Sequence, residues 1–224
     1  MKIASTRTAA TIATLGLMLA ANVAGARENY SKWSATAQVG LGSLSSSSLS
    51  YSDGISSETT SANFEESFAG GGTLGYRIGN GWSVEGEIQY RRNDLEAVDV
   101  PTLGSFSGGD FASLGIAVNA LYNFDIGESG KLSGYVGPGF VYFEEIDIDF
   151  DQAGEQELSF ETDDTAFQIK FGGRYQFSDR WFMDAGATWL TADSVRLELP
   201  ADSAQTISSD YDHWTLRIGA GLRF

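Results

Sequence analysis

The last stretch of the chain, residues 211–224, constrains the fold most, because apolar residues occupy every second position along it. The apolar set is Trp214, Leu216, Ile218, Ala220, Leu222 and Phe224, and the set between them is Thr215, Arg217, Gly219, Gly221 and Arg223. In a β-strand these two sets face opposite sides. One face of this strand is therefore apolar and ends on an aromatic residue, whereas the other face places two arginines among glycines.

Seven earlier segments repeat this alternation. We predict strands at residues 33–43, 68–78, 82–91 and 112–124, a strand that starts at Leu132, and strands at 167–177 and 181–190. The phase of the strand from Leu132 is open. We place Val136, Pro138, Phe140 and Tyr142 on its apolar outer face, and the same phase continues through Ile146, Ile148 and Phe150. The chain therefore offers eight strands, each with one apolar and one polar face.

The connections between these strands alternate in length. Short turns lie at 79–81, 125–131 and 178–180, and long polar connections lie at about 44–66, 92–110, 144–164 and 192–210. The first long connection is Ser-rich and has the composition of a solvated loop. Residues 144–164 carry ten carboxylates and no Lys or Arg, yet their apolar residues still alternate, so we expect a hairpin that stays strand-like beyond the body of the fold. A ten-strand count is open, because a long connection could hide another hairpin.

We predict a cleaved signal peptide at residues 1–26 and one mature domain at residues 27–224. Lys2 and Arg7 accompany an apolar stretch at 11–20, and Ala24-Gly25-Ala26 offers small residues for cleavage. This stretch is shorter than the roughly 20 residues that a membrane helix needs. All other apolar stretches are broken by charges or glycines, so the chain could cross a membrane only as a closed barrel.

The composition excludes several classes of function. The formal charge is -16 for the whole chain and becomes -18 when Lys2 and Arg7 leave with the signal peptide, which holds no acid. Such an acidic protein lacks the cations that nucleic acid phosphates need, so we expect no nucleic acid partner. The chain has no cysteine, which excludes disulfides and thiol chemistry.

The distribution of polar and aromatic residues favours a membrane barrel over a soluble one. A soluble barrel would turn its apolar face inward, but the second face of these strands is too polar for a dry core. Short turns at one end and long loops at the other are typical of bacterial outer-membrane barrels. Two groups of aromatic residues suit the two bilayer interfaces. They are Tyr76, Trp82, Phe124, Phe177, Trp181 and Phe224 near the short turns, and Tyr90, Tyr142, Trp189 and Trp214 farther along the strands.

The leader, the eight amphipathic strands and the terminal Leu222-Arg223-Phe224 resemble the small outer-membrane barrels of Gram-negative bacteria, the superfamily of the OmpA membrane domain, OmpX, NspA and OmpW. The resemblance implies an all-β fold: an eight-stranded antiparallel up-and-down transmembrane β-barrel with short periplasmic turns and long extracellular loops. It implies an outer-membrane location among lipids and lipopolysaccharide. It also implies that Trp214, Leu222 and Phe224 form a C-terminal signal for the barrel assembly machinery. We expect a monomer.

Nine charged residues fall on the inward face of these strands. They are Arg77, Glu85, Glu87, Arg91, Lys170, Arg174, Asp184, Arg217 and Arg223. An eight-stranded barrel is just wide enough for side chains to fill it, and buried charges must be paired or they become costly. The pattern therefore predicts a salt-bridged lumen with some water, and not an open pore. A gated ion path, in which a cation switches between two carboxylates, is the alternative.

We predict no enzymatic activity and no cofactor. Enzymes on this architecture use Ser with His, and the hydroxyl needs a base within hydrogen-bond reach. His213, the only histidine, lies near the outer end of the last strand, where we interpret it as polar surface. A lipid A or phospholipid-modifying enzyme is the remote alternative.

Asp147, Asp149 and Asp151 share one side of a predicted strand and are weak candidates for a metal site. Calcium favours clustered oxygen ligands, but Gln152 and Leu158 stand where an EF-hand loop needs its glycine and its last glutamate. We interpret these acids as a solvated anionic face and predict no bound metal. A second hypothesis is that divalent cations bridge them to lipopolysaccharide phosphates.

Two functions compete on this evidence. We favour a barrel that anchors acidic surface loops for envelope integrity, adhesion or surface interaction, because the loops are long and polar. A narrow channel for small hydrophobic or ionic solutes is the alternative. It would need an apolar trough in the upper barrel, for which the candidates are Leu121, Val141, Phe143, Phe182 and Leu190. No motif in the loops identifies a partner.

Overall fold

The computed structural model describes residues 32–44, 47–96, 98–100, 104–106, 108–151, 158–199 and 202–224. The signal peptide predicted at residues 1–26 lies outside these ranges. Within them, the regular structure consists of β-strands, and no helix is long and apolar enough to cross a membrane. The predicted all-β class is confirmed.

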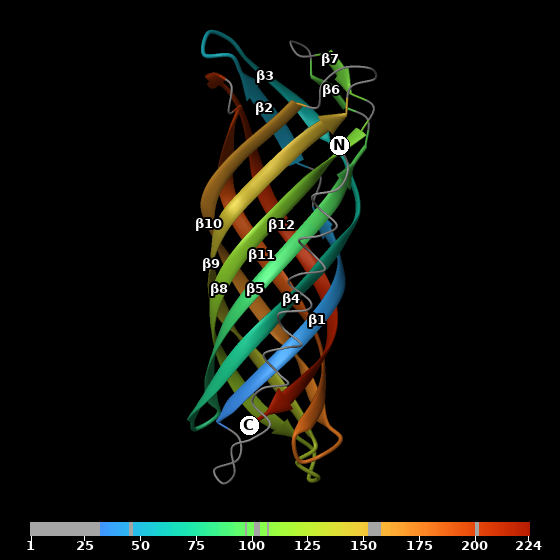
Figure 1. Cartoon of the computed structure of the whole chain (residues 1–224), viewed down its shortest axis with the longest axis vertical. Helices are drawn as coiled ribbons and strands as arrows, with labels where there is room; N and C mark the ends of the chain where they lie inside the picture. Colours follow the sequence, from blue (N-terminus) through green and yellow to red (C-terminus); the bar gives the residue numbers. More distant parts are fainter. Residues whose placement is uncertain are drawn as a thin grey trace.

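Eight antiparallel strands close into a barrel (Figure 1). They are β1 (Trp33–Leu44), β4 (Phe64–Gly79), β5 (Trp82–Leu95), β8 (Gly108–Ile126), β9 (Leu132–Asp151), β10 (Leu158–Gln176), β11 (Trp181–Leu199) and β12 (Asp202–Arg223). Each strand pairs with the next in this order, and β12 pairs back to β1 with Ala37 opposite Ala220. The amphipathic C-terminal stretch therefore closes the barrel, as the eight-stranded up-and-down prediction requires.

The two ends of the barrel differ. At one end, which we call the turn end, short connections join β4 to β5, β8 to β9 and β10 to β11. Asn80 has a φ of 52° and Gly81 a φ of 83°, the left-handed conformations that suit a tight hairpin. At the opposite end, which we call the loop end, the strands continue well past the rest of the barrel, which we call the barrel body (Figure 1).

The long connections contain more strand than the sequence predicts. β2 (Ser47–Ser52) and β3 (Ser57–Ala62) form a hairpin in the stretch predicted to be a solvated loop. β2 also pairs with β12, where Tyr51 lies opposite Ile207. β6 (Val98–Val100) and β7 (Gly104–Phe106) form a separate two-stranded sheet. The closed ring still has eight strands, so the extra hairpin does not make a ten-stranded barrel.

The prediction of loops at 92–110 and 192–210 is also wrong, because strands occupy most of these segments. β5 and β8 extend into the first of them, and β11 and β12 leave only residues 200–201 between them. The buried apolar side chains of these extensions alternate with polar ones, as strand geometry requires. They are Leu95, Phe111, Val195, Leu197 and Ile207. This alternation continues the strands far beyond the barrel body.

The barrel body carries an apolar belt on its outer surface. We define this belt by the exposed side chains of Val39, Leu41, Leu74, Ile88, Val118, Phe140, Leu216 and Ile218. Phe140 is 58% exposed, and Val136 and Tyr142 are exposed beside it, which confirms the phase predicted for the first part of β9. At the turn end, the rings of Trp33 and Tyr76 lie 4.8 Å apart between centroids.

A β-bulge in β9 reverses which side chains point inward. The pairing of β9 with β8 skips Glu144, which is an extra residue. One extra residue turns all the side chains that follow it to the other face. Ile146, Ile148 and Phe150 are fully buried as a result, so the prediction that they continue the outward phase of β9 is wrong.

Beyond this bulge the loop end encloses an apolar core. Its members include Leu49, Tyr51, Phe106, Phe143, Ile146, Ile148, Phe150, Phe160, Val195, Leu197 and Ile207. The rings of Phe111 and Phe143 meet the ring of Tyr211 edge-on, with centroids 5.1 and 5.8 Å away. Hairpin β2–β3 and strand β7 contribute side chains to this core together with the barrel strands. The loop end therefore packs like the interior of a soluble protein.

Candidate functional site in the barrel interior

The inward side chains of β5 trace the interior from the turn end to the loop end. In order they are Ser83, Glu85, Glu87, Gln89, Arg91, Asn93 and Leu95, and all are buried. They pass through a vestibule, a charged cluster, a small cavity, a polar network and the apolar core. The interior is therefore a series of chemically distinct layers, which we describe in this order.

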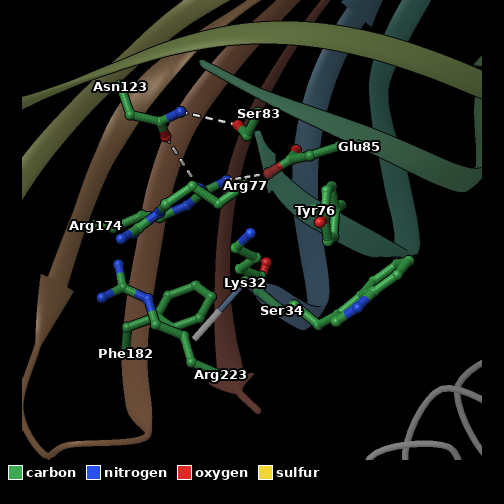
Figure 2. Close-up of a pocket in the computed structure, with 12 residues that line it drawn as sticks. Lys32, Ser34, Tyr76, Arg77, Ser83, Glu85, Asn123, Arg174, Phe182 and Arg223 are labelled. Carbon is green, nitrogen blue, oxygen red and sulfur yellow. Dashed lines mark hydrogen bonds and ion pairs between the residues drawn. The ribbon is translucent and has the colours of Figure 1, made fainter. Parts of the chain in front are cut away.

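The vestibule opens at the turn end and is lined by cations (Figure 2). Its space is ≈ 350 Å³, counting the solvent at its mouth, and Lys32, Arg77, Arg174 and Arg223 line it. Arg223 donates to Gln176 Oε1. Arg77 is exposed, and among the described residues neither Arg77 nor Arg223 forms an ion pair with a carboxylate. These two residues of the predicted lumen network therefore lie at its mouth.

The charged cluster joins strands on opposite sides of the lumen. Lys170 Nζ, from β10, lies 2.6 Å from Glu87 Oε2 and 3.4 Å from Glu85 Oε2, both from β5. Arg174 binds Glu85 and lies 3.0 Å from Asp184 Oδ2. The side chains of Glu85 and Glu87 are each 3% exposed. Since β5 and β10 are not neighbours in the sheet, these ion pairs bridge the interior.

A sixth predicted residue, Arg217 from β12, completes the cluster. Its Nη1 lies 3.9 Å from Glu87 Oε1, and its Nη2 donates to the Tyr135 hydroxyl at 3.2 Å. Tyr135 donates in turn to Asp184 Oδ1 at 3.0 Å. Buried ion pairs repay the loss of hydration only when their remaining donors and acceptors are also bonded. The tyrosine supplies such a bond to both charges.

The cluster also contains neutral residues that were not predicted from the sequence. Gln38 donates to Glu87 Oε1 at 2.7 Å, and Asn119 donates to Glu87 Oε2 at 3.1 Å. Gln168 donates to Asn119 Oδ1 at 2.6 Å. These residues and Tyr135 occupy inward positions of their strands, so the same alternation that selected the charged residues could have found them.

His213 lies in a buried polar network at the boundary between the cavity and the apolar core. It has no exposed surface, so its interpretation as polar surface is wrong. It occupies an inward position of β12, which begins at Asp202 and so extends well before His213 in the sequence. Its Nε2 lies 3.0 Å from Ser67 Oγ and 3.2 Å from Asn93 Oδ1, and its Nδ1 lies 3.1 Å from Thr215 Oγ1.

The hydrogen-bond network fixes the tautomer of His213. Asn93 Nδ2 donates to the Phe111 carbonyl at 3.2 Å, which leaves Asn93 Oδ1 as an acceptor facing Nε2. We therefore assign the proton to Nε2, and Nδ1 accepts from Thr215. Ser67 then faces an N–H group and not a lone pair. This arrangement does not provide the base that a nucleophilic serine needs.

The predicted metal candidates lie outside the barrel at the loop end. Asp147 and Asp149 gather with Asp110 of β8, with ligand atoms within 4.8 Å of one another. The side chain of Asp151 is not among those described. Burial, and then the neighbouring charges of Asp149, Glu145 and Asp110, raise the pKa of Asp147 to about 7. Arg92 Nη2 lies 2.9 Å from Asp110 Oδ2, so a cation of the protein already binds this group.

The five apolar residues proposed for a trough all lie inside the barrel. Val141, Phe143 and Leu190 are fully buried members of the apolar core, and Leu121 and Phe182 are buried nearer the turn end. The bulge in β9 adds further apolar side chains to the same space. Val141, Phe143 and Leu190 belong to the apolar core of the loop end, whereas Leu121 and Phe182 are not members of that cluster.

The outer membrane protein beta-barrel domain family matches residues 10–224. The chain is similar to Neisserial surface protein A (NspA), at 17% identity and a TM-score of 0.52, with 88% of this chain and 100% of the other covered. It is also similar to the outer membrane protein OprG from Pseudomonas aeruginosa, at 18% identity and a TM-score of 0.62, with 88% and 98% covered. At these identities the likeness bears on the fold alone. A search of curated protein sequences found no match.

Proposed function

We propose a function for this chain, which belongs to the outer membrane protein beta-barrel domain family and lies in the outer membrane of a Gram-negative bacterium. It is a closed barrel that holds a rigid acidic platform at the cell surface. The platform is the loop end of the barrel, and its partner is a surface or molecule that carries positive charge. The barrel body anchors the platform in the membrane.

One observation carries the closed state of the barrel: two plugs of opposite chemistry fill its interior in series. The charged cluster comes first, with Lys170 Nζ 2.6 Å from Glu87 Oε2 across the lumen. The apolar core follows, where Phe143, Ile148 and Phe160 are fully buried. A hydrated ion would have to separate the ion pairs and then cross an apolar layer. Both steps oppose conduction, which favours an anchor over a channel.

The outer face of the loop end supplies the acidic platform. Its outward carboxylates are Asp94, Asp110, Glu144, Glu145, Asp147, Asp149, Glu161, Asp163 and Glu198. Among the described residues of these extensions, the cations are Arg92 and Arg196. Like charges held close together create a negative potential that attracts cationic partners and weakens as salt is added.

The apolar core makes this platform rigid. Strands β9 and β10 pair beyond the bulge from Ile146 opposite Thr162 to Phe150 opposite Leu158. The inward side chains of Ile146, Ile148, Phe150 and Phe160 are buried, so the outward acids are held on a fixed surface instead of a mobile loop. A surface that is ordered before binding loses little conformational entropy on binding. This order favours recognition of a partner over simple solvation.

Conductance in planar lipid bilayers tests the closed barrel. We expect the refolded protein to insert without producing stable current steps. A substitution of Phe140 to Leu on the outer belt is the matched control, because it leaves the interior untouched and should behave in the same way. Ion-selective steps in the native protein that change in the Glu85→Gln/Glu87→Gln variant would instead support the gated ion path.

Binding of polylysine to the protein in zwitterionic nanodiscs tests the acidic platform. Neutralising Asp149, Glu161 and Asp163 with their amides should weaken binding severalfold at low salt, and the difference should shrink near 0.5 M salt, because exposed charges are then screened. The matched control neutralises Asp125, Glu128 and Asp179 at the turn end, with the same change in charge. Equal losses in both variants would contradict a localised platform.

A further inference from the structure

A small cavity lies between the charged cluster and the polar network of His213. It is lined by Gln38, Gly40, Glu87, Gln89, Arg91, Thr188, Thr215 and Arg217 among others, and its space is ≈ 280 Å³, counting open solvent. Arg91, Gln89 and Arg217 are each at least nine-tenths buried. The cavity is therefore lined by two guanidinium groups that have little contact with bulk water.

Three buried donors in this lining have no hydrogen-bond partner. They are Gln89 Nε2, Arg91 Nη1 and Arg217 Nε. The other nitrogens of Arg91 are bonded, since Nη2 donates to Gln89 Oε1 at 2.9 Å and Nε donates to Thr215 Oγ1 at 3.5 Å. Among the buried side-chain atoms of the described residues, one acceptor, Gln168 Oε1, also lacks a partner, but Gln168 does not line the cavity. Three unbonded buried donors with no unbonded buried side-chain acceptor in the same lining indicate a missing acceptor.

The charges around the cavity do not balance. The interior holds four cations, the buried Arg91, Lys170 and Arg217 and the partly buried Arg174, against three carboxylates, Glu85, Glu87 and Asp184. Among the described residues, Arg91 has no carboxylate at ion-pair distance. One positive charge therefore remains without a counter-ion in the protein. An isolated buried charge is costly, so a bound charge of opposite sign would stabilise the barrel.

We propose that this cavity binds one small monovalent anion of the halide class, held by Arg91, Gln89 and Arg217. A halide accepts from several donors at once and donates to none, which matches the three unbonded N–H groups. A single negative charge balances the excess of one. A larger or multiply charged anion would meet Glu87, which lines the same cavity. The inference does not depend on the acidic platform or on its partner.

Thermal unfolding after refolding in different salts tests the site. The full mature chain is refolded in detergent with sodium chloride, sodium bromide or sodium gluconate at equal ionic strength. Chloride and bromide should raise Tm above its value in gluconate, saturably and by about 2–4 °C, since a ligand that binds only the folded state stabilises it. Equal Tm values in all three salts would overturn the proposal.

Two variants locate the effect. Gln89→Glu places a carboxylate beside Arg91, so it should remove the halide dependence and raise Tm in gluconate. Arg77→Gln is the matched control, because it removes an exposed cation at the vestibule mouth, and it should keep the dependence. A halide effect that survives in the Gln89→Glu variant would place the site elsewhere and overturn the proposal.

Anomalous diffraction from crystals grown in bromide provides a readout that needs no variant. We expect a bromide peak within hydrogen-bond distance of Arg91 Nη1 and Gln89 Nε2. A cavity that holds only water, without an anomalous signal, would show that solvent satisfies the three donors. That result would overturn the anion site even if halides change Tm.

Discussion

The barrel body and the loop end are built from the same strands with opposite chemistry. In the body, apolar side chains such as Phe140 are exposed outside, and charges such as Glu87 and Lys170 are buried inside. In the loop end, apolar side chains such as Ile148 are buried inside, and acids such as Asp149 lie outside. The difference follows the solvent, because lipid surrounds the body and water surrounds the loop end. Each region places outward the residues that its surroundings accept.

In β9 and β11, bulges contribute to this inversion. The extra residue Glu144 turns the apolar alternation of β9 from outside to inside. The register of β11 with β12 shifts between Ala192 and Val195, and Val195 and Leu197 are then buried. The alternation of apolar and polar residues therefore does not have to stop where the strand leaves the membrane. A single inserted residue is enough to move the apolar side chains from one face of the strand to the other.

Deletion of Glu144 should produce the largest difference in stability between the loop end and the body. It would turn Ile146, Ile148 and Phe150 outward into water. Each buried side chain of this kind contributes about 1.5–3 kcal/mol, so their loss would remove about 5–9 kcal/mol from the loop end. Limited proteolysis should then cut β9 and β10 beyond the belt, while the body resists. Deletion of Glu128 in an exposed turn is the control, and unchanged protease resistance in both deletions would contradict the role of the bulge.

The Lys170→Met substitution tests the body and should have the next largest effect. It leaves Glu85 and Glu87 buried beside each other with fewer counter-charges, which costs about 3–5 kcal/mol in comparable buried pairs. The free energy of unfolding in urea, followed by tryptophan fluorescence in lipid vesicles, measures this loss. Adding Glu87→Gln should restore part of it, because one unpaired charge is then removed.

An exposed ion pair provides the control for that measurement. Arg92 binds Asp110 at 2.9 Å at the loop end, and its side chain is 42% exposed. The Arg92→Met substitution should therefore cost no more than about 1 kcal/mol. If both lysine and arginine variants lost the same small amount, the charged cluster would not be the structural plug of the body.

Much of the body follows from the alternation of residues alone. Side chains alternate along a strand, so every second residue points inward. This rule alone places Glu85 and Lys170 in the same lumen, without any knowledge of their distance. Their pairing could not be predicted in the same way. Which inward residues meet across a barrel depends on strand tilt and stagger, and the sequence of one strand does not encode these quantities.

The loop end was harder to predict for a different reason. Its apolar residues keep the same spacing on both sides of Glu144, so nothing in the alternation marks the bulge. The stretch around Leu49 and Tyr51 is Ser-rich, and its composition hides two apolar residues at strand spacing. Burial of these residues is a tertiary effect, since they pack against side chains from distant strands. Local composition therefore gave the wrong structure for this segment.

The Asp147→Asn substitution should have a smaller effect than Lys170→Met, and the effect should depend on pH. The pKa of Asp147 is raised to about 7 in the folded chain, from an ordinary value of 3.8. The folded state therefore binds more protons than the unfolded state between these values, and native stability falls as pH rises from about 4 to about 7. Asparagine removes the buried charge, so the variant should gain stability over the native chain across this range and keep that gain above pH 7. The gain should be about 1–2 kcal/mol at pH 8, because part of the side chain is solvated, and close to zero near pH 3.5.

Urea unfolding at the two pH values measures this gain in the free energy of unfolding, with Glu161→Gln as an exposed control at the same end. A gain of the same size at both pH values would mean that the acids of the loop end are not crowded, and that its outer face is ordinary solvated surface.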